Sequence, residues 1–515
     1  MTQKPPTSEK LGKSMLTGMT WRFFAIYSQA FLNIFVLATL SRLLSPEDFG
    51  LMGIVAIFVG LAELLSELGV GPAIIQIKNL TRIHLRVAFT LAVLFGIVMV
   101  GILWVVAPLI ARFFDNEQVT QVLRAVSLDF FFGGFGVVSL SLLRRKLLFK
   151  KLMWVDIGSY TIGYALVGLG MAWSGYGVWA LVGATISQRF LKSLFLLIME
   201  PIPLKPSLSR PELRELVQFG GGITLARFFN YGASQGDYFV VGRFLGVGSL
   251  GIYTRAYRLM NLPANYLGRV LDTVLFPVMS KIQNQIPRLT KSYLTGIAMI
   301  SIVCAPVGIL MVIMAPEIVN LLLGPQWVEV ILPFQVLAIG VLPRVSYKID
   351  NSLAKAMGAV YQRSFRDAIY AAAVIIGALI GLKWGLVGVA FGVLVALLIY
   401  NFVSLRLSIQ LLGVPFSEYG KAQLPGLLIA LMVAFVALPV RGLLVSYDSP
   451  AWFILIVTTI VSLLSICVLF FWRPQKILGV HGTNALVMVF ESVPTRYFPK
   501  IVMHWFNTRI IEGTI

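Results

Sequence analysis

Long apolar segments divide this sequence from near its start to near its end. Each is about 20 residues long, the length that an α-helix needs to cross the hydrocarbon core of a bilayer. Roughly fourteen can be counted, at residues 17–40, 50–76, 87–110, 118–141, 155–173, 177–199, 217–241, 250–276, 293–315, 329–354, 365–382, 386–405, 423–441 and 451–472. Backbone polar groups inside a bilayer must bond within their own segment, so we predict an all-α polytopic membrane protein with about 14 transmembrane helices.

Composition supports this class and argues against a nucleic-acid partner. The chain is 58% hydrophobic and 12% charged, whereas a soluble protein would carry about twice that charged fraction. Its formal net charge is +20, but the basic residues lie in short clusters between apolar segments rather than on one domain. We therefore predict no nucleic-acid partner and attribute most of this charge to membrane topology.

The basic clusters also predict the orientation of the chain. They occur in every second loop, for example at residues 78–86 and 144–151, while the loops between them hold at most one basic residue, such as Arg42 or Arg112. Because basic loops stay in the cytoplasm, this alternation favours an even number of spans with both termini cytoplasmic. The first segment lacks a signal-peptide cleavage pattern, so we expect it to remain in the mature protein.

The two halves of the chain resemble each other. GMTWRFF at 18–24 recurs as GITLARFF at 222–229, and RLLSPEDFGLM at 42–52 recurs as RFLGVGSLGIY at 243–253. The matches include arginine and glycine as well as leucine, which makes chance similarity of apolar helices a poor explanation. Each half begins with six spans, so we predict a parallel repeat with a pseudo-two-fold axis along the membrane normal.

These features predict the domain organisation. The longest internal connection is rich in proline and then in charge, as in a linker. The predicted parts are a cytoplasmic N-terminal tail (1–16), an N-terminal six-helix bundle (17–199), a cytoplasmic linker (200–216), a C-terminal six-helix bundle (217–405), two additional transmembrane helices (406–472) and a cytoplasmic interfacial tail (473–515).

Ionisable residues inside two consecutive spans point to a functional site. On a helix, Arg227, Asn230, Ser234 and Asp237 fall within an arc of roughly 80°, and Arg255, Arg258, Asn261, Asn265, Arg269 and Asp272 fall within roughly 120°. Charges at this depth must face protein or water rather than lipid. The acids suit either a structural network or a functional role, whereas the more numerous arginines favour an anion site.

Other spans carry smaller polar stripes. The first has Arg22, and the tenth has Arg344, Lys348 and Lys355 with Asp350 to one side. We expect Arg344 and Lys355, near the span ends, to reach the membrane surface, and Lys348 to lie deeper. Basic stripes in both halves predict a cationic cavity between the two bundles.

Two acidic residues in the first half allow two interpretations. Glu63 lies in the second span and Asp129 in the fourth. Either residue would bind a proton or sodium ion that drives transport, or neutralise a basic neighbour such as Arg22.

Enzyme and metal-site motifs are missing from the sequence. There is no phosphate-binding loop, no H-E-x-x-H and no segment long enough for a large extramembrane domain. Cys304 and Cys467 lie in apolar runs, as packing residues do. We predict that the protein is not an enzyme and has no metal site and no cofactor other than a coupling H⁺ or Na⁺.

Several segments resemble a known family. They are W-x-x-x-A-x-x-S-Q followed by ATLSRLLSPEDFGLMGIVAIFVGLAELLSELGVGPAIIQ, then SQGDYFVVGRFLGVGSLGIYTRAYRLMNLPANYLGRVLDTVLFPVMSKIQ, LLGPQWVEV and GLVGVAFG. Over most of residues 15–470 the chain resembles the polysaccharide-exporting branch of the multidrug, oligosaccharidyl-lipid and polysaccharide flippase superfamily. The resemblance implies two six-helix bundles around a central cleft, followed by two further helices.

The resemblance also implies a function. Such proteins turn undecaprenyl-pyrophosphate-linked oligosaccharides across the bacterial inner membrane by alternating access, for exopolysaccharide, capsule or O-antigen synthesis. Their partners are that substrate, the lipid bilayer and other glycan-assembly membrane proteins. The cavity residues that it implies here are Arg22, Arg227, Asp237, Arg255 and Arg258, then Lys348 and Arg269; Glu63 and Asp237 are the candidates for a coupling ion.

Two other functions are alternatives to this one. A cation-coupled multidrug exporter of the same superfamily would share the fold, but its cavity should be more acidic so that it attracts cationic drugs. A membrane-embedded glycan polymerase or ligase would be an enzyme, and we would expect a large periplasmic loop with catalytic residues. Neither pattern is visible in the sequence.

Overall fold

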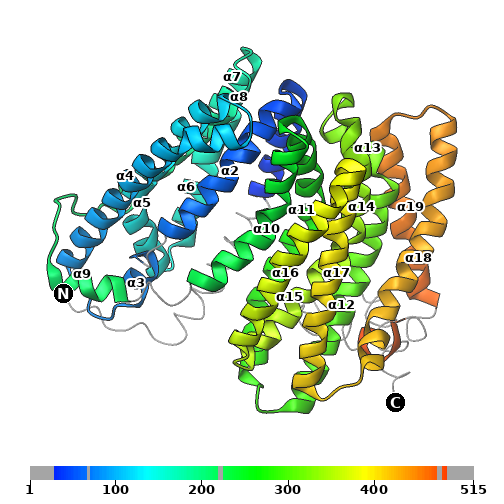
Figure 1. The fold of residues 1–515 in the computed structure, drawn as a ribbon. Coiled ribbons are helices and arrows are strands. Elements are labelled where there is room, and N and C mark those ends of the chain that lie inside the picture. Colours follow the sequence, from blue (N-terminus) through cyan, green and yellow to red (C-terminus); the bar gives the residue numbers. More distant parts are fainter. Residues whose placement is uncertain (1–27, 67–69, 219–223, 473–477, 484–515) are drawn as a thin grey trace. The chain divides into compact units, whose positions relative to one another are not determined.

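The computed structural model describes residues 28–66, 70–218, 224–472 and 478–483, and the regular structure there is helical, without strands (Figure 1). The helices are Ser28–Leu43, α2 (Pro46–Ser66), α3 (Val70–Gln76), α4 (Arg82–Phe113), α5 (Gln118–Arg145), α6 (Phe149–Tyr160), a π-helix (Thr161–Gly168), α7 (Leu169–Trp173), α8 (Val178–Met199), α9 (Arg210–Gln218), α10 (Thr224–Phe244), α11 (Val247–Lys281), α12 (Ile286–Ile313), α13 (Ala315–Leu322), a 3₁₀ segment (Pro325–Val330), α14 (Ile331–Ile339), α15 (Val341–Ala356), α16 (Val360–Gly381), α17 (Gly385–Leu412), α18 (Phe416–Ser446) and α19 (Ala451–Trp472). The predicted all-α class is confirmed.

The helices are long and apolar enough for a multi-pass membrane protein. Among the described residues, eight helical stretches could cross a membrane, or nine if the bent pair Pro325–Ile339 and Val341–Ala356 forms one span. One stretch, Phe365–Leu412, has 48 residues and contains two of the predicted spans. The described part of each predicted span is largely helical. The count of fourteen stays a prediction, because α10 and α11, which carry the polar stripes, are not among the eight.

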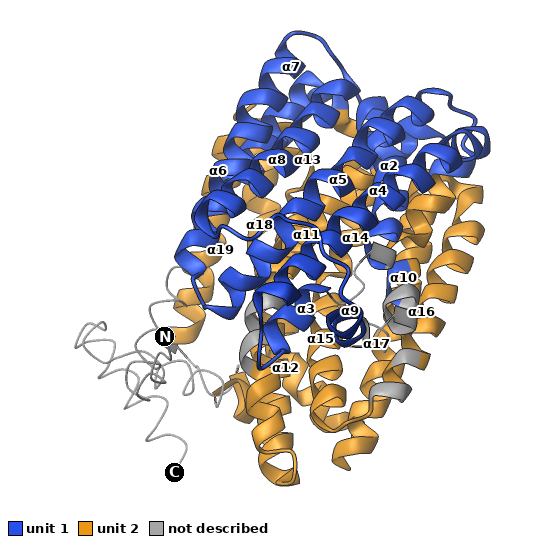
Figure 2. Ribbon diagram, turned by 90° about the vertical axis from the view of Figure 1, so that its left-hand side faces the viewer, with its two compact units in different colours: residues 1–231, 242–252, 322–326 blue, residues 232–241, 253–321, 327–515 orange. Residues whose placement is uncertain are grey.

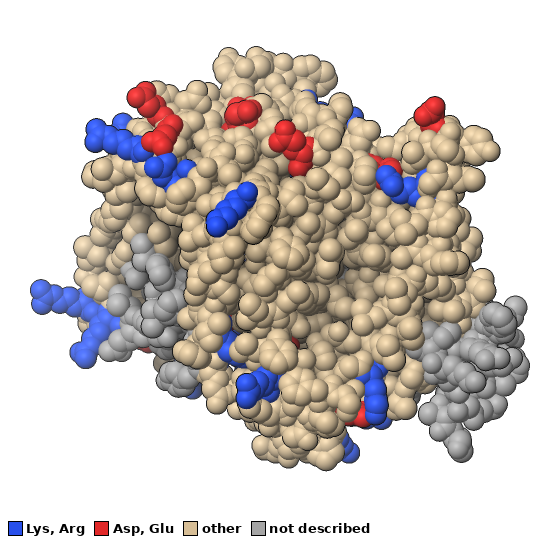
Figure 3. Space-filling model, turned by 45° about the vertical axis from the view of Figure 1, so that its right-hand side comes forward, with Lys and Arg blue, Asp and Glu red and all other residues tan. Residues whose placement is uncertain are grey.

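The outer surfaces of these helices are suited to lipid. Large apolar side chains stand exposed along α18 and α19, among them Phe435 at 80% and Leu464 at 59%. On the face drawn in Figure 3, uncharged residues make up most of the surface, and Lys, Arg, Asp and Glu side chains are scattered among them. A water-soluble protein would not leave so many large apolar groups in contact with solvent.

The chain divides into two compact units (Figure 2). Unit 1 comprises residues 1–231, 242–252 and 322–326, and unit 2 comprises residues 232–241, 253–321 and 327–515. In unit 1, α5 packs against both α4 and α8; in unit 2, α12 packs against α18 and α16 against α17. The predicted boundary at residue 217 thus falls inside unit 1, and the predicted domain limits stay predictions.

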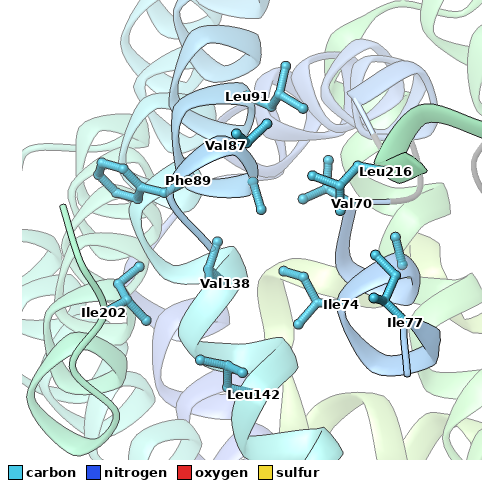
Figure 4. Packing of buried hydrophobic residues seen from close by; sticks show 12 residues of the cluster. Val70, Ile74, Ile77, Val87, Phe89, Leu91, Val138, Leu142, Ile202 and Leu216 are labelled. Carbon is cyan, nitrogen blue, oxygen red and sulfur yellow. The ribbon is translucent and has the colours of Figure 1, made fainter. Parts of the chain in front are cut away.

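An apolar cluster in unit 1 joins α3, α4 and α5 to the segment that follows α8 (Figure 4). Ile74 comes from α3, Val87 from α4 and Val138 from α5, and none of the three is exposed to solvent. Ile202 and Leu216 add side chains from the segment predicted as a linker. Leu216 is fully buried although α9 is otherwise strongly polar, so the apolar side of α9 packs on this cluster.

Polar contacts hold the predicted linker to unit 1. The His84 imidazole lies 3.0 Å from the Glu215 carboxylate, and Arg86 donates to the carbonyl oxygens of Lys205 and Pro206 at 3.0 and 3.1 Å. Lys146 forms an ion pair with Glu200 at 2.5 Å. Residues 200–218 are therefore bound along the rest of unit 1.

The start of α9 is fixed by its own side chains. The Ser209 hydroxyl donates to the Glu212 carboxylate in the first turn, and this hydrogen bond lowers the pKa of Glu212. The carboxylate form therefore prevails at neutral pH, where it also interacts favourably with the positive end of the helix dipole.

Several helix pairs approach most closely at glycine. A Cβ at Gly377 of α16 would lie 2.6 Å from the carbonyl oxygen of Gly392 of α17, and a Cβ at Gly392 would lie 2.1 Å from that of Gly377. In unit 1, Gly134 of α5 approaches the Ala92 carbonyl of α4 in the same way, at 2.7 Å. Small residues at helix crossings are expected in membranes, where packing rather than water exclusion holds helices together.

One glycine contact relates the two sequence repeats. A Cβ at Gly50 would lie 1.9 Å from the carbonyl oxygen of Val247, and a Cβ at Gly251 would lie 1.8 Å from that of Pro46. In the repeat, Gly50 corresponds to Gly251 and Pro46 to Val247, so the two contacts are reciprocal. Such a contact is expected of two similar elements related by a two-fold axis.

Replacing either glycine of this contact should destabilise the protein. In Gly50→Ala or Gly251→Ala the new methyl group meets a backbone carbonyl that cannot move alone, and overpacking of this kind costs about 1–3 kcal/mol or more. The unfolding temperature of the detergent-solubilised protein, followed by size-exclusion chromatography after heating, should fall.

Gly101→Ala on α4 is the matched control, because nothing lies within 4 Å of its added Cβ. It should unfold at the wild-type temperature or above, since alanine favours the helix. If Gly50→Ala and Gly251→Ala unfold like Gly101→Ala, the close contact does not exist.

Candidate functional site

Buried charges and tyrosines gather in unit 2 where α10, α11 and α15 supply one group of side chains. We call this group the basic–aromatic cluster, and its members are Asp237, Tyr238, Tyr253, Arg255, Tyr257, Arg258 and Arg344. Helical spacing explains two pairs within it, because residues three or four apart share one face of a helix. Tyr253 and Tyr257 are related in this way on α11, as are Arg255 and Arg258.

Asp237 is the acid of this cluster, and it is held by hydrogen bonds. Only 1% of it is exposed; its Oδ2 accepts from the Tyr253 hydroxyl and its Oδ1 from the Tyr238 amide, both at 2.9 Å. The Tyr238 ring packs edge-on against the rings of Tyr253 and Tyr257. Among the side chains that the structure describes, no Arg or Lys forms an ion pair with Asp237.

Arg344 corrects one prediction. Its guanidinium does not reach the membrane surface: the residue is 8% exposed and lies over the Tyr257 ring, 4.9 Å from the ring centroid. Its Nε has no hydrogen-bond partner, and within the described part of the chain it forms no ion pair with a carboxylate. The cation is therefore stabilised mainly by aromatic faces, which leaves a donor available to an anion.

The cluster carries more positive than negative charge. Arg255 is buried at 8% exposure, whereas Arg258 is exposed. The charges of Arg255, Arg258 and Arg344 all lie close enough to act on Tyr238, and Asp237 is the acid that does so. Among the described members of the cluster, three guanidinium groups accompany one carboxylate, which produces a positive potential suited to an anion.

The remaining predicted cavity residues are distributed differently. Lys348, on α15, is half-buried and donates from Nζ to the Ala264 carbonyl oxygen at 3.0 Å. Arg227 lies on α10 and Arg269 on α11, but their side chains fall outside the described structure. Arg22 lies outside the described residues altogether. The predicted roles of these residues stay predictions.

Unit 1 has a polar group of its own, centred on Arg189 of α8. Arg189 Nε lies 2.8 Å from both carboxylate oxygens of Asp129, and its Nη2 lies 2.6 Å from Asp129 and 3.1 Å from Glu63. Asp129 is buried and Glu63 is exposed. Of the two interpretations of these acids, the structure displays neutralisation by a basic neighbour; the role of Glu63 as a coupling-ion ligand stays a prediction.

A second buried acid in unit 2, Asp350, lies outside the basic–aromatic cluster. It is not exposed at all, and its Oδ1 accepts from the Tyr293 hydroxyl at 2.7 Å and the Ser408 hydroxyl at 2.8 Å. Across the described residues, no three His, Cys, Asp or Glu side chains are grouped as a metal site requires.

The sequence matches a known family and several relatives. A sequence model of the family described as Polysaccharide biosynthesis protein matches residues 39–332. Over 416 residues the chain is 24% identical to Lipopolysaccharide biosynthesis protein WzxC of Escherichia coli (strain K12), covering 79% of this chain and 84% of that protein. It is 23% identical over 351 residues to Teichuronic acid biosynthesis protein TuaB of Bacillus subtilis (strain 168), covering 67% and 72% of the two chains.

A solved structure shares the fold. The structure titled "Lipid II flippase MurJ, inward closed conformation" matches with a TM-score of 0.70 at 16% identity, covering 88% of this chain and 99% of that chain. At this identity the likeness concerns the fold alone, that of an all-α polytopic membrane transporter.

Removing Arg189 should destabilise the protein strongly, because Asp129 would stay buried without its cation. We expect Arg189→Ala to cost on the order of 3–5 kcal/mol, seen as a large fall in the unfolding temperature in detergent. Glu63→Gln should cost much less, since Glu63 is exposed and Arg189 keeps Asp129.

The double variant Asp129→Leu/Arg189→Leu removes both charges and should recover much of the lost stability. Arg189→Ala as stable as the wild type would show that the ion pair is not formed in the membrane protein.

Proposed function

We propose, from the premise that the chain belongs to the polysaccharide biosynthesis protein family, that it is a flippase and not an enzyme. It moves lipid-linked oligosaccharides across the bacterial inner membrane for exopolysaccharide, capsule or O-antigen synthesis, by alternating access. Both termini lie in the cytoplasm. Its partners are the lipid-linked substrate, the bilayer and other glycan-assembly membrane proteins.

One observation carries the choice of substrate class: the excess of buried cations in the basic–aromatic cluster. Burying a guanidinium in a membrane protein is costly, so it persists where it binds something. A lipid carrier joined to its glycan by a pyrophosphate presents oxygens that arginine binds in pairs of charge-assisted hydrogen bonds. Arg255 and Arg344, with Arg258 at the exposed side, would hold that group.

The names of the relatives support recognition of the lipid carrier, which different substrates can have in common, rather than of one particular sugar. One is named for lipopolysaccharide and another for teichuronic acid, which are different glycans. A family that serves different glycans needs one recognition element common to all of them. An anionic link between lipid and sugar is such an element, and it is the part that the arginines suit.

A multidrug exporter of the same superfamily is the second candidate. Such a protein would bind cationic drugs and would need acidic groups at its site. In the basic–aromatic cluster the one acid, Asp237, already accepts two hydrogen bonds from the protein. The positive potential around it would repel a cation, so we favour the flippase.

Neutralising the cluster should weaken substrate binding before it affects folding. Each charge-assisted hydrogen bond contributes about 1.5–3 kcal/mol, so Arg255→Ala and Arg344→Ala should each weaken the binding of undecaprenyl pyrophosphate roughly tenfold to hundredfold. Binding is measured on the purified protein in nanodiscs. In a deletion strain, the same variants should fail to restore surface glycan although the protein reaches the membrane.

Arg406→Ala is the matched control, because Arg406 is an exposed arginine of α17 outside the cluster. It should bind and export like the wild type. Normal binding and export by Arg344→Ala and Arg255→Ala would remove these arginines from the site, and tighter binding of cationic drugs than of the pyrophosphate would favour the exporter.

A further inference from the structure

Helix α8 of unit 1 carries a polar stripe along one side. The stripe consists of four half-buried residues within an arc of roughly 100° on the helix, namely Thr185, Gln188, Arg189 and Lys192. Large exposed apolar side chains lie on the opposite side, namely Phe190, Leu194 and Ile198. One side of α8 is therefore suited to lipid and the other to water or a polar ligand.

The stripe lies deep in a span. Helix α8 is long and apolar enough to cross a membrane, and Gln188 lies halfway along its 22 residues. Lipid offers no hydrogen bonds at this depth, so polar side chains that are only half-buried must face water-filled space. We therefore expect this side of α8 to line a water-accessible surface inside the membrane.

The remainder of this surface comes from α6 and the π-helix. Lys192 forms an ion pair with Asp156 of α6 at 2.8 Å, and the Thr185 hydroxyl lies 3.1 Å from the Tyr164 hydroxyl of the π-helix. The Tyr164 ring stacks on the Tyr160 ring, with the centroids 4.9 Å apart. These contacts define one surface, the α6–α8 polar face, with the half-buried members Asp156, Tyr164, Thr185, Gln188 and Lys192.

The π-helix Thr161–Gly168 positions this face. π-Helices are rare and frequently occur at functional sites. Two of its glycines bring it close to α8: a Cβ at Gly163 would lie 2.6 Å from the Cβ of Gln188, and a Cβ at Gly168 would lie 2.9 Å from that of Ala184. The π-helix therefore packs on α8 at the level of the polar stripe and holds its tyrosine there.

The charges at this face are balanced. Lys192 is paired with Asp156, and Arg189, next to the face, is paired with Asp129 and Glu63. The basic–aromatic cluster, by contrast, has an excess of cations. Without such an excess the face is poorly suited to a pyrophosphate. Its hydroxyl, amide, carboxylate and ammonium groups suit sugar hydroxyls, which both donate and accept hydrogen bonds.

We propose that the α6–α8 polar face binds the oligosaccharide part of the substrate, an inference that rests on the proposed function. The Tyr164 hydroxyl, the Gln188 amide and the Lys192–Asp156 pair bond sugar hydroxyls directly or through one water molecule. Two chemistries then recognise one substrate. The arginines of unit 2 bind the anionic link, and the charge-balanced polar groups of unit 1 bind the sugar.

Two probes separate these two kinds of recognition. One is the oligosaccharide released by mild acid from the lipid-linked intermediates of the host bacterium, and the other is undecaprenyl pyrophosphate without sugar. Binding of each is measured on the full-length protein in nanodiscs. Gln188→Ala and Tyr164→Phe each remove one neutral hydrogen-bonding group, so each should weaken oligosaccharide binding roughly twofold to tenfold. Both should bind undecaprenyl pyrophosphate like the wild type.

A third variant should give a larger effect. Asp156→Leu/Lys192→Leu removes both members of the ion pair, so no charge is left unpaired inside the membrane. Because hydrogen bonds to charged groups are stronger, oligosaccharide binding should weaken roughly tenfold to hundredfold. Binding of undecaprenyl pyrophosphate should again stay at the wild-type level.

Gln410→Ala is the matched control, because Gln410 is an exposed glutamine of α17 in unit 2. It should bind both probes like the wild type. Tyr164→Phe guards against misfolding, since it keeps the ring that stacks on Tyr160. Its unfolding temperature in detergent should equal that of the wild type.

Three results would overturn the proposal. They are oligosaccharide binding at the wild-type level in all three variants, no oligosaccharide binding by the wild type, and an equal loss of undecaprenyl pyrophosphate binding in the variants. Failure of the proposed function would look different, because the wild type would then not bind undecaprenyl pyrophosphate and Arg344→Ala would change nothing. The effect of Gln188→Ala on the oligosaccharide would still decide whether the face binds sugar.

Discussion

The free energy of burying charge constrains every functional feature of this protein. Its helices are apolar enough to sit in lipid, yet several carry ionisable groups that face the protein interior, and each is stabilised differently. Asp129 has an ion pair with Arg189, Asp237 has a tyrosine hydroxyl and a backbone amide, and Arg344 has an aromatic face. In the ion pair, each charged group binds the other, so few of their hydrogen-bonding atoms are left to bind a ligand. Arg344, which lies over the Tyr257 ring, keeps an Nε donor that can bind an anion.

Helical periodicity predicted which residues of the site share one face of a single helix. The stripes on residues 224–281 indicated that Asp237 and Arg255 face the protein interior, and both are buried, although Arg258 on the same stripe as Arg255 is exposed. Position along the span did not predict the surroundings of Arg344. The helices Pro325–Ile339 and Val341–Ala356 meet at a bend of 42°, and Arg344 lies just after this bend, buried against Tyr257.

Long-range partners could not be predicted from periodicity. Arg189 is a single arginine in an apolar helix, and its acids lie 60 and 126 residues away in sequence. A sequence pattern shows that Glu63 needs a cation but not which one. The linker gave a similar result: its prolines and charges indicated a connection between two halves, and the structure adds the carbonyl groups that bind Arg86.

The reciprocal contact of Gly50 and Gly251 has a consequence for how the chain can vary. Each glycine lies against a backbone carbonyl supplied by the other repeat, so a larger residue at either position meets the same obstacle. Because the obstacle is backbone, a change in a neighbouring side chain cannot relieve it. The two positions are therefore restricted to glycine together, each by the main chain of the other repeat.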